Sequence, residues 1–171
     1  MQRTKWTERN FCFDFPEGWI YNILERLRGT HPRICDLVKG YSNASLSEYM
    51  AGWSVKEHIG HLTDVEELHA GRIDDLLMRL DKLRSADMTN EKTNEANHNG
   101  NDIEYHLLMF EKSRNHFIKK LKNIDDATHV YKALHPRLQV MMRPVDVAYF
   151  TAEHDDHHLA SIQLILDNIY D

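Results

Sequence analysis

The sequence has few cysteines. Only Cys12 and Cys35 occur in 171 residues, far apart and without CxxC spacing. This scarcity argues against a disulfide framework, and it leaves no cysteine cluster for a closed structural metal site. Two isolated cysteines are typical of reduced thiols, so we expect a cytoplasmic protein.

Long apolar runs and basic runs are also lacking. No stretch approaches the roughly 18 uninterrupted apolar residues of a membrane-spanning helix, and residues 1–15 lack the features of a signal peptide. The net charge of −6 argues against a general binder of nucleic acid or anionic membranes. The length and ordinary composition predict one globular domain over residues 1–171.

Apolar residues recur at helical spacing in four segments. A first-turn proline, Pro16, favours a helix start there, and Ser54 with Glu57 has the form of a capping box. Gly29 and Pro32 predict a kink or a break near Thr30 in the first segment. The predicted helices span residues 16–39, 54–84, 102–122 and 144–169.

No segment shows the alternation of a β-strand, so the sequence predicts an all-α protein. Four long amphipathic helices imply an antiparallel four-helix bundle, either up-down or a variant with crossovers. The connector 41–53 allows a short helical turn at Leu46–Met50. The polar loop 85–101 is long for a compact domain. It either partly covers a functional site or is a plain surface excursion.

Histidine is the unusual residue in the composition. The chain has 12 histidines, and five of them fall in two short clusters. In the fourth predicted helix, His154 and His158 are four residues apart on a row of otherwise mostly apolar side chains. Two imidazoles at this spacing project from one helix face and can chelate one metal. The alternative is a pair of core histidines satisfied by neighbouring side chains or water.

The second predicted helix offers the third ligand. His58 and His61 lie near its start, and spacing alone does not choose between them. Antiparallel packing of the second and fourth helices brings either residue near His154 and His158, given some stagger. Three imidazoles with an open position suit a catalytic divalent metal: zinc or nickel first, with iron or manganese as alternatives. The carboxylates available to orient the rings are Asp64, Glu153, Asp155 and Asp156.

Two histidine-containing segments carry a family resemblance. They are WSVKEHIGHLTD, from Trp53 to Asp64, and HDDHHLASI, from His154 to Ile162. Together they resemble the DinB-like superfamily, which includes bacillithiol S-transferase and mycothiol-dependent maleylpyruvate isomerase enzymes. Further similar segments lie at residues 86–90, 95–99, 134–138 and 142–150. The likeness spans roughly residues 20–165.

The resemblance implies a four-helix bundle with one divalent metal held by His61, His154 and His158. It favours His61 over His58 and leaves His157 as a neighbour of the site. It also implies a homodimer, and an enzyme in which the metal activates a low-molecular-weight thiol for transfer to a small electrophile.

Other readings of the chain are a metal-dependent hydrolase and a non-catalytic dimeric metal-binding or stress-response protein. No residues that recognise a thiol stand out in the sequence. His98, Arg137 and Arg143 are the candidates for meeting an anionic ligand.

Overall fold

The structure, a computed structural model, describes residues 3–48 and 52–169. Over these residues four long helices form the body of the protein, and no helix among them is long and apolar enough to span a membrane. The long helices are α1 (Ile20–Val38), α2 (Val55–Leu77), α4 (Ile103–Lys122) and α6 (Pro144–Ile169). The short elements are η1 (Trp6–Glu8), η2 (Glu17–Trp19), η3 (Ser45–Ser47), α3 (Glu91–Glu95), η4 (His98–Gly100), α5 (Asp126–His129), β1 (Ala133–His135) and β2 (Val140–Met142).

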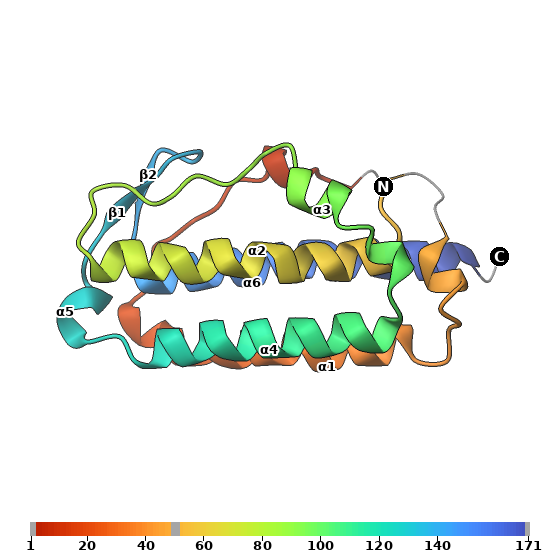
Figure 1. The fold of residues 1–171 in the computed structure, drawn as a ribbon. Coiled ribbons are helices and arrows are strands. Elements are labelled where there is room, and N and C mark those ends of the chain that lie inside the picture. Colours follow the sequence, from red (N-terminus) through yellow and green to blue (C-terminus); the bar gives the residue numbers. More distant parts are fainter. Residues whose placement is uncertain (1–2, 49–51, 170–171) are drawn as a thin grey trace.

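The helices form a four-helix bundle, as the sequence predicts, and its connectivity is the variant with a crossover. Each of α1 and α2 packs against both α4 and α6, so α1 and α2 occupy opposite corners (Figure 1). Residues 78–102 carry the chain back along α2, so α4 runs in the same direction as α2. Helix α6 runs antiparallel to α2, the arrangement on which the expected histidine site was based.

Two helix boundaries differ from the prediction. Helix α1 begins at Ile20 rather than Pro16, because the residues directly after Pro16 form the short helix η2. Helix α2 ends at Leu77 rather than Arg84, because Arg79 adopts a positive φ of 58° and Leu83 then donates a backbone hydrogen bond to Leu134. Leu83 therefore joins the core cluster at this end of the bundle from a loop position and not from a helix. Helix α1 continues through Pro32 without a break. Of the predicted turn at 46–50, η3 covers the beginning, and residues 49–50 lie outside the described residues.

The prediction of no strands is wrong at one place. Strands β1 and β2 form an antiparallel hairpin in which Ala133 pairs with Met142 and His135 with Val140. Three-residue strands are too short to show alternation in a sequence, and here the turn contains Gln139 at a positive φ of 56°. The hairpin lies beside the C-terminal half of α2, over one end of the bundle (Figure 1).

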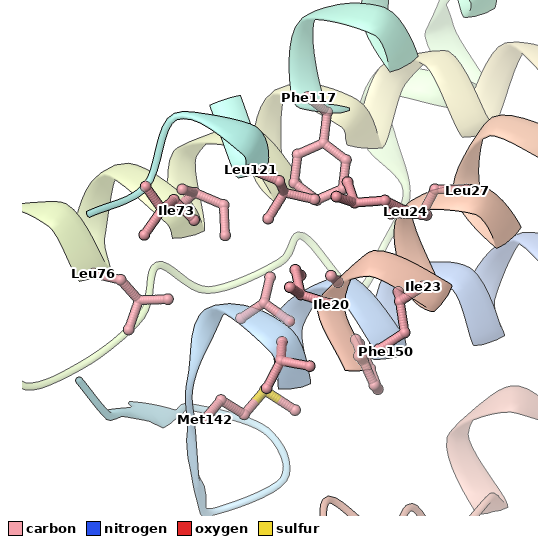
Figure 2. Packing of buried hydrophobic residues seen from close by; sticks show 14 of the residues in the cluster. Ile20, Ile23, Leu24, Leu27, Ile73, Leu76, Phe117, Leu121, Met142 and Phe150 are labelled. Carbon is pink, nitrogen blue, oxygen red and sulfur yellow. The ribbon is translucent and has the colours of Figure 1, made fainter. Parts of the chain in front are cut away.

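The apolar core consists of two clusters along the bundle. One lies at the hairpin end, where side chains from α1, α2, α4 and α6 converge around Ile73, Phe117 and Leu121 (Figure 2). The other lies at the opposite end and includes Ile34, Ile59, Phe110 and Ile162. Buried polar side chains also lie in the bundle, among them His61, Glu66, Arg114, Asp155 and His158.

A buried arginine links all four helices between these clusters. Arg114 of α4, 2% exposed, donates from Nε to Glu66 Oε1 of α2 at 3.0 Å and from Nη2 to Asp155 Oδ1 of α6 at 2.9 Å. Its Nη1 donates to the Leu27 carbonyl of α1 at 3.3 Å, and Thr30 donates to Asp155 Oδ2 at 2.7 Å. These bonds set the register of the helices relative to one another.

We expect Arg114→Ala to lower the free energy of unfolding by about 3–5 kcal/mol, because it leaves two buried carboxylates without their cation. Chemical denaturation followed by circular dichroism measures this. Arg28→Ala is the matched control: its exposed pair with Glu25 is worth at most about 1 kcal/mol. Similar losses for the two variants would contradict this role for Arg114.

Candidate metal centre

The start of α2 fixes the height of its histidines. Ser54 caps the helix by accepting from the Glu57 amide at 3.2 Å, and the Glu57 carboxylate accepts from the Ser54 amide at 2.7 Å. The predicted capping box is therefore confirmed. His61 follows about two turns later, 5% exposed, on the side of α2 that faces α6.

His61, His154 and His158 come together between α2 and α6. Each offers one nitrogen, and these nitrogens all lie within 4.8 Å of one another. The Nε2 atoms of His154 and His158 are 3.1 Å apart. Nitrogens that bind one tetrahedral zinc at about 2.0–2.1 Å are themselves roughly 3.3 Å apart. The donor set and its spacing therefore fit a divalent metal.

Hydrogen bonds orient the ring of His61. Its Nδ1 lies 3.0 Å from Thr93 Oγ1, and the Thr93 hydroxyl donates to Asp64 Oδ2 at 2.9 Å. Because that hydroxyl proton is used, the threonine oxygen accepts from Nδ1–H of His61, which leaves the Nε2 lone pair for a metal. His98 Nε2 donates to the same Asp64 oxygen at 2.9 Å. Gly60 permits this, since a Cβ there would lie 2.3 Å from the His98 ring.

His58 supports the site from outside the ligand set. Its Nδ1 lies 2.9 Å from Nδ1 of His158, so one ring donates to the other and the Nε2 atom of His158 faces His154. The structure thus places both histidines of the α2 cluster at the site, with His61 in the group of three and His58 behind His158. The buried Nδ1 of His154 has no hydrogen-bond partner within the described part of the chain.

Burial keeps these rings neutral. It lowers the pKa of His61 to about 4 and that of His58 to about 3, and it also lowers the pKa of His154 and of His158 well below the usual value. The neutral imidazole is the form that binds a metal, so the group of three is ready to act as ligands at neutral pH.

A cavity of about 540 Å³ opens beside the three histidines. Trp53 and Trp6 wall it, with ring centroids 4.6 Å from His61 and 5.1 Å from His154 respectively. The loop 85–101 contributes Ala86, Met88 and other residues to the lining, so this loop covers the site and is not a plain surface excursion.

The carboxylates of α6 do not orient the ligands. Asp155 binds Arg114, while Glu153 and Asp156 both pair with Arg26 of α1. Of the four predicted carboxylates, only Asp64 reaches a ligand, and it does so through Thr93. A threonine in a polar loop gives no sequence signal for this role.

The other predicted residues are divided between the cavity and the surrounding structure. His157 and Arg137 line the cavity. Arg143 pairs with Glu17 at 2.8 Å and Asp146 at 2.9 Å, so it serves the helix start and not a ligand. His98 serves Asp64. The lining also includes Arg72, His69 and His135, and these residues were not among those predicted for the site.

The comparisons with known proteins concern the family and the fold. Residues 44–162 match the sequence profile of the DinB superfamily. A search of the curated proteins finds no match.

Two solved structures share the fold. One is YfiT from Bacillus subtilis, described as "a probable metal-dependent hydrolase with an unusual four-helix bundle topology". It superposes with a TM-score of 0.72 at 15% identity, over 92% of this chain and 91% of that one. The other is the mycothiol-dependent maleylpyruvate isomerase, with a TM-score of 0.69 at 10% identity, over 87% of this chain and 61% of that one. At these identities the likeness shows the fold alone.

We expect the purified protein to contain about one divalent metal per chain, and His158→Ala to reduce this to background, because it removes one of three ligands. Elemental analysis by mass spectrometry measures both. The control is His116→Ala, which removes an exposed histidine of α4 and should retain the metal. Equal and negligible metal in the wild type and His158→Ala would rule out the site.

The Thr93 bond gives a separate prediction. Thr93→Val removes the acceptor for His61 Nδ1–H while keeping the side-chain shape, and we expect it to weaken metal affinity about 10–100-fold. Competition with a chromophoric chelator measures the affinity. Thr4→Val, at an exposed position, is the control. An unchanged affinity in Thr93→Val would show that the hydrogen bond does not support the ligand.

Proposed function

The chain belongs to the DinB superfamily, and we propose that it is a metal-dependent enzyme whose divalent ion is held by His61, His154 and His158. One observation carries the proposal: three neutral imidazoles converge at the wall of a cavity of about 540 Å³. That volume is in the range of small-molecule sites. Zinc or nickel suits the ligands best, with iron or manganese as alternatives.

The protein's own residues would position the ion and restrict water. When bound, a divalent metal lowers the pKa of a thiol or water that it coordinates. Thr93 and Asp64 hold the ring of His61, and His58 holds that of His158. Trp6 and Trp53 place apolar surface around the rings, which strengthens electrostatic interactions there. Three ligands leave a position for an exchangeable group.

We propose thiol S-transfer as the reaction. A low-molecular-weight thiol such as bacillithiol loses its proton to solvent, its sulfur forms a bond to an electrophilic carbon, and the leaving group departs with the electron pair of the bond that breaks. The size of the cavity supports this reaction, because it has room for a thiol and a small electrophile together. The shared fold with a mycothiol-dependent isomerase is consistent with a thiol as cosubstrate. We also propose that the protein is a homodimer. A cytoplasmic location is proposed because Cys12 and Cys35 are free cysteines.

Metal-dependent hydrolysis is the second candidate. The observation in its favour is the fold shared with YfiT over nine-tenths of both chains, because YfiT is described as a probable hydrolase. The same three histidines and the same cavity would serve it, with water in place of the thiol.

Thiol consumption separates the two candidates. We expect metal-replete protein to consume bacillithiol or glutathione with at least one member of an electrophile panel, and His61→Ala to lower the rate about 1000-fold or more. His116→Ala is the control and should keep the wild-type rate. Turnover of an ester or amide without thiol would favour hydrolysis. Metal-replete protein that consumes no thiol above background with any electrophile would rule out S-transfer.

A further inference from the structure

The wall of the cavity also holds polar groups that have no partner. Both ring nitrogens of His69 are buried and have no hydrogen-bond partner among the described residues. The same holds for Nε2 of His135 and Nη2 of Arg137. Arg72 is 3% exposed. All four residues line the same cavity as the three histidines, and we call them the Arg72–Arg137 cluster. Buried polar atoms are normally bonded, so a group of unbonded ones in the residues of a cavity wall calls for a ligand.

Arg72 does not form an ion pair with the carboxylate of Asp75. The nearby Asp75 is fully occupied by Arg84, whose amide donates to Oδ2 at 2.7 Å and whose Nη2 donates to Oδ1 at 2.8 Å. Arg72 donates only from Nε, to the Arg84 carbonyl at 3.2 Å, and no acceptor for its Nη atoms is found within residues 3–48 and 52–169. Burial and the charge of Arg137 lower the pKa of Arg72 to about 10, so it stays cationic at neutral pH.

The hairpin supplies the other donors. His135 of β1 accepts the Leu138 amide at Nδ1, 3.2 Å away, so its neutral ring carries the proton on Nε2. Burial and the two arginines lower the pKa of His135 to about 3, which keeps it a neutral donor. Arg137, in the turn after β1, lies 5.8 Å from the ring centroid of Phe150 and forms no ion pair with any described residue.

The one acidic side chain of the described cavity lining does not compensate these cations. Asp87 is exposed, and its carboxylate accepts from the amide and hydroxyl of Thr89 and from the amide of Glu91. Buried Arg72, whose pKa the charge of Arg137 lowers, and half-buried Arg137 are thus left without an ion-pair partner among the described residues, which is costly unless an anion joins them.

We propose that the Arg72–Arg137 cluster binds a carboxylate of the substrate, between the guanidinium groups of Arg72 and Arg137. The planar guanidinium fork matches a carboxylate with two parallel hydrogen bonds. His135 Nε2 donates a further bond. This deepens the proposed function and rests on it, since the other end of the molecule reaches the three histidines. Arg72 follows His61 by about three helical turns, and its side chain leans back toward the start of α2. The substrate is therefore a carboxylic acid of at most roughly 16 Å, since eleven residues at about 1.5 Å each separate His61 from Arg72.

The test uses metal-free protein, so it does not depend on turnover. Thermal denaturation is followed in a succinate series at constant ionic strength, with chloride as the balancing salt. We expect succinate at ten times its Kd to raise the Tm of the wild type by about 3 °C. Arg72→Gln and Arg137→Gln should each weaken succinate binding about 10–100-fold. Arg72→Lys should weaken it less, because the charge remains and the fork is lost.

Two control variants test whether succinate binds at the Arg72–Arg137 cluster. Arg28→Gln removes an exposed arginine of α1 and should respond as the wild type does. His158→Ala should also keep the response, so loss of the metal site and loss of the carboxylate site are distinguishable. Arg137→Gln serves where Arg72→Gln fails to fold, since Arg137 makes no hydrogen bond that the fold needs.

Three results would overturn the proposal. One is no rise in Tm with succinate in the wild type. Another is an equal rise in the wild type, Arg72→Gln and Arg137→Gln, which would place the binding elsewhere. The third comes from a parallel series with inorganic phosphate. If phosphate binds more tightly than succinate through the same two arginines, the cluster is a phosphate site and not a carboxylate site.

Discussion

The bundle depends on the ion pairs of Arg114. A buried guanidinium is stable only with its carboxylates in place, and Glu66 and Asp155 can both reach it in one register of α2 against α6. Glu66 lies between His61 and His69 in the sequence, and Asp155 directly follows His154. The register that satisfies the arginine is therefore the register that brings His61 to His154 and His158. The catalytic proposal depends on this structural contact.

The sequence predicted the long helices well where local rules decide. The capping box at Ser54 and the helices at 102–122 and 144–169 follow from side-chain chemistry within a few residues. The end of α2 could not be predicted in this way, because Leu83 suits a helical stripe and a strand contact equally well. The direction of α4 depends on the path of residues 78–102, which no periodicity encodes.

The candidate site was predictable to a similar degree. The spacing of His154 and His158 identifies a chelating pair, since four residues place two rings on one helix face. Spacing does not separate His61 from His58, because both lie on the same flank of α2. The family resemblance favours His61, and in the structure His61 belongs to the group of three while His58 contacts His158. Thr93 in the short helix α3 and Arg137 in the hairpin turn belong to segments that fold over the bundle, so their place in the site depends on tertiary contacts that a sequence pattern lacks.

The charges of the cavity connect its two features. The histidines of the cavity are neutral. For His69 and His135 the charge of Arg72 contributes to this, because it lowers the pKa of both rings. Three neutral ligands leave the full charge of a divalent ion uncompensated, and Arg72 and Arg137 add two more positive charges beside it. With Asp87 engaged in its own loop, the balancing negative charge has to come from the ligand. With a divalent ion bound and in the proposed reaction, such a cavity would favour an anionic substrate and the thiolate over the thiol, because both would reduce the same excess of positive charge.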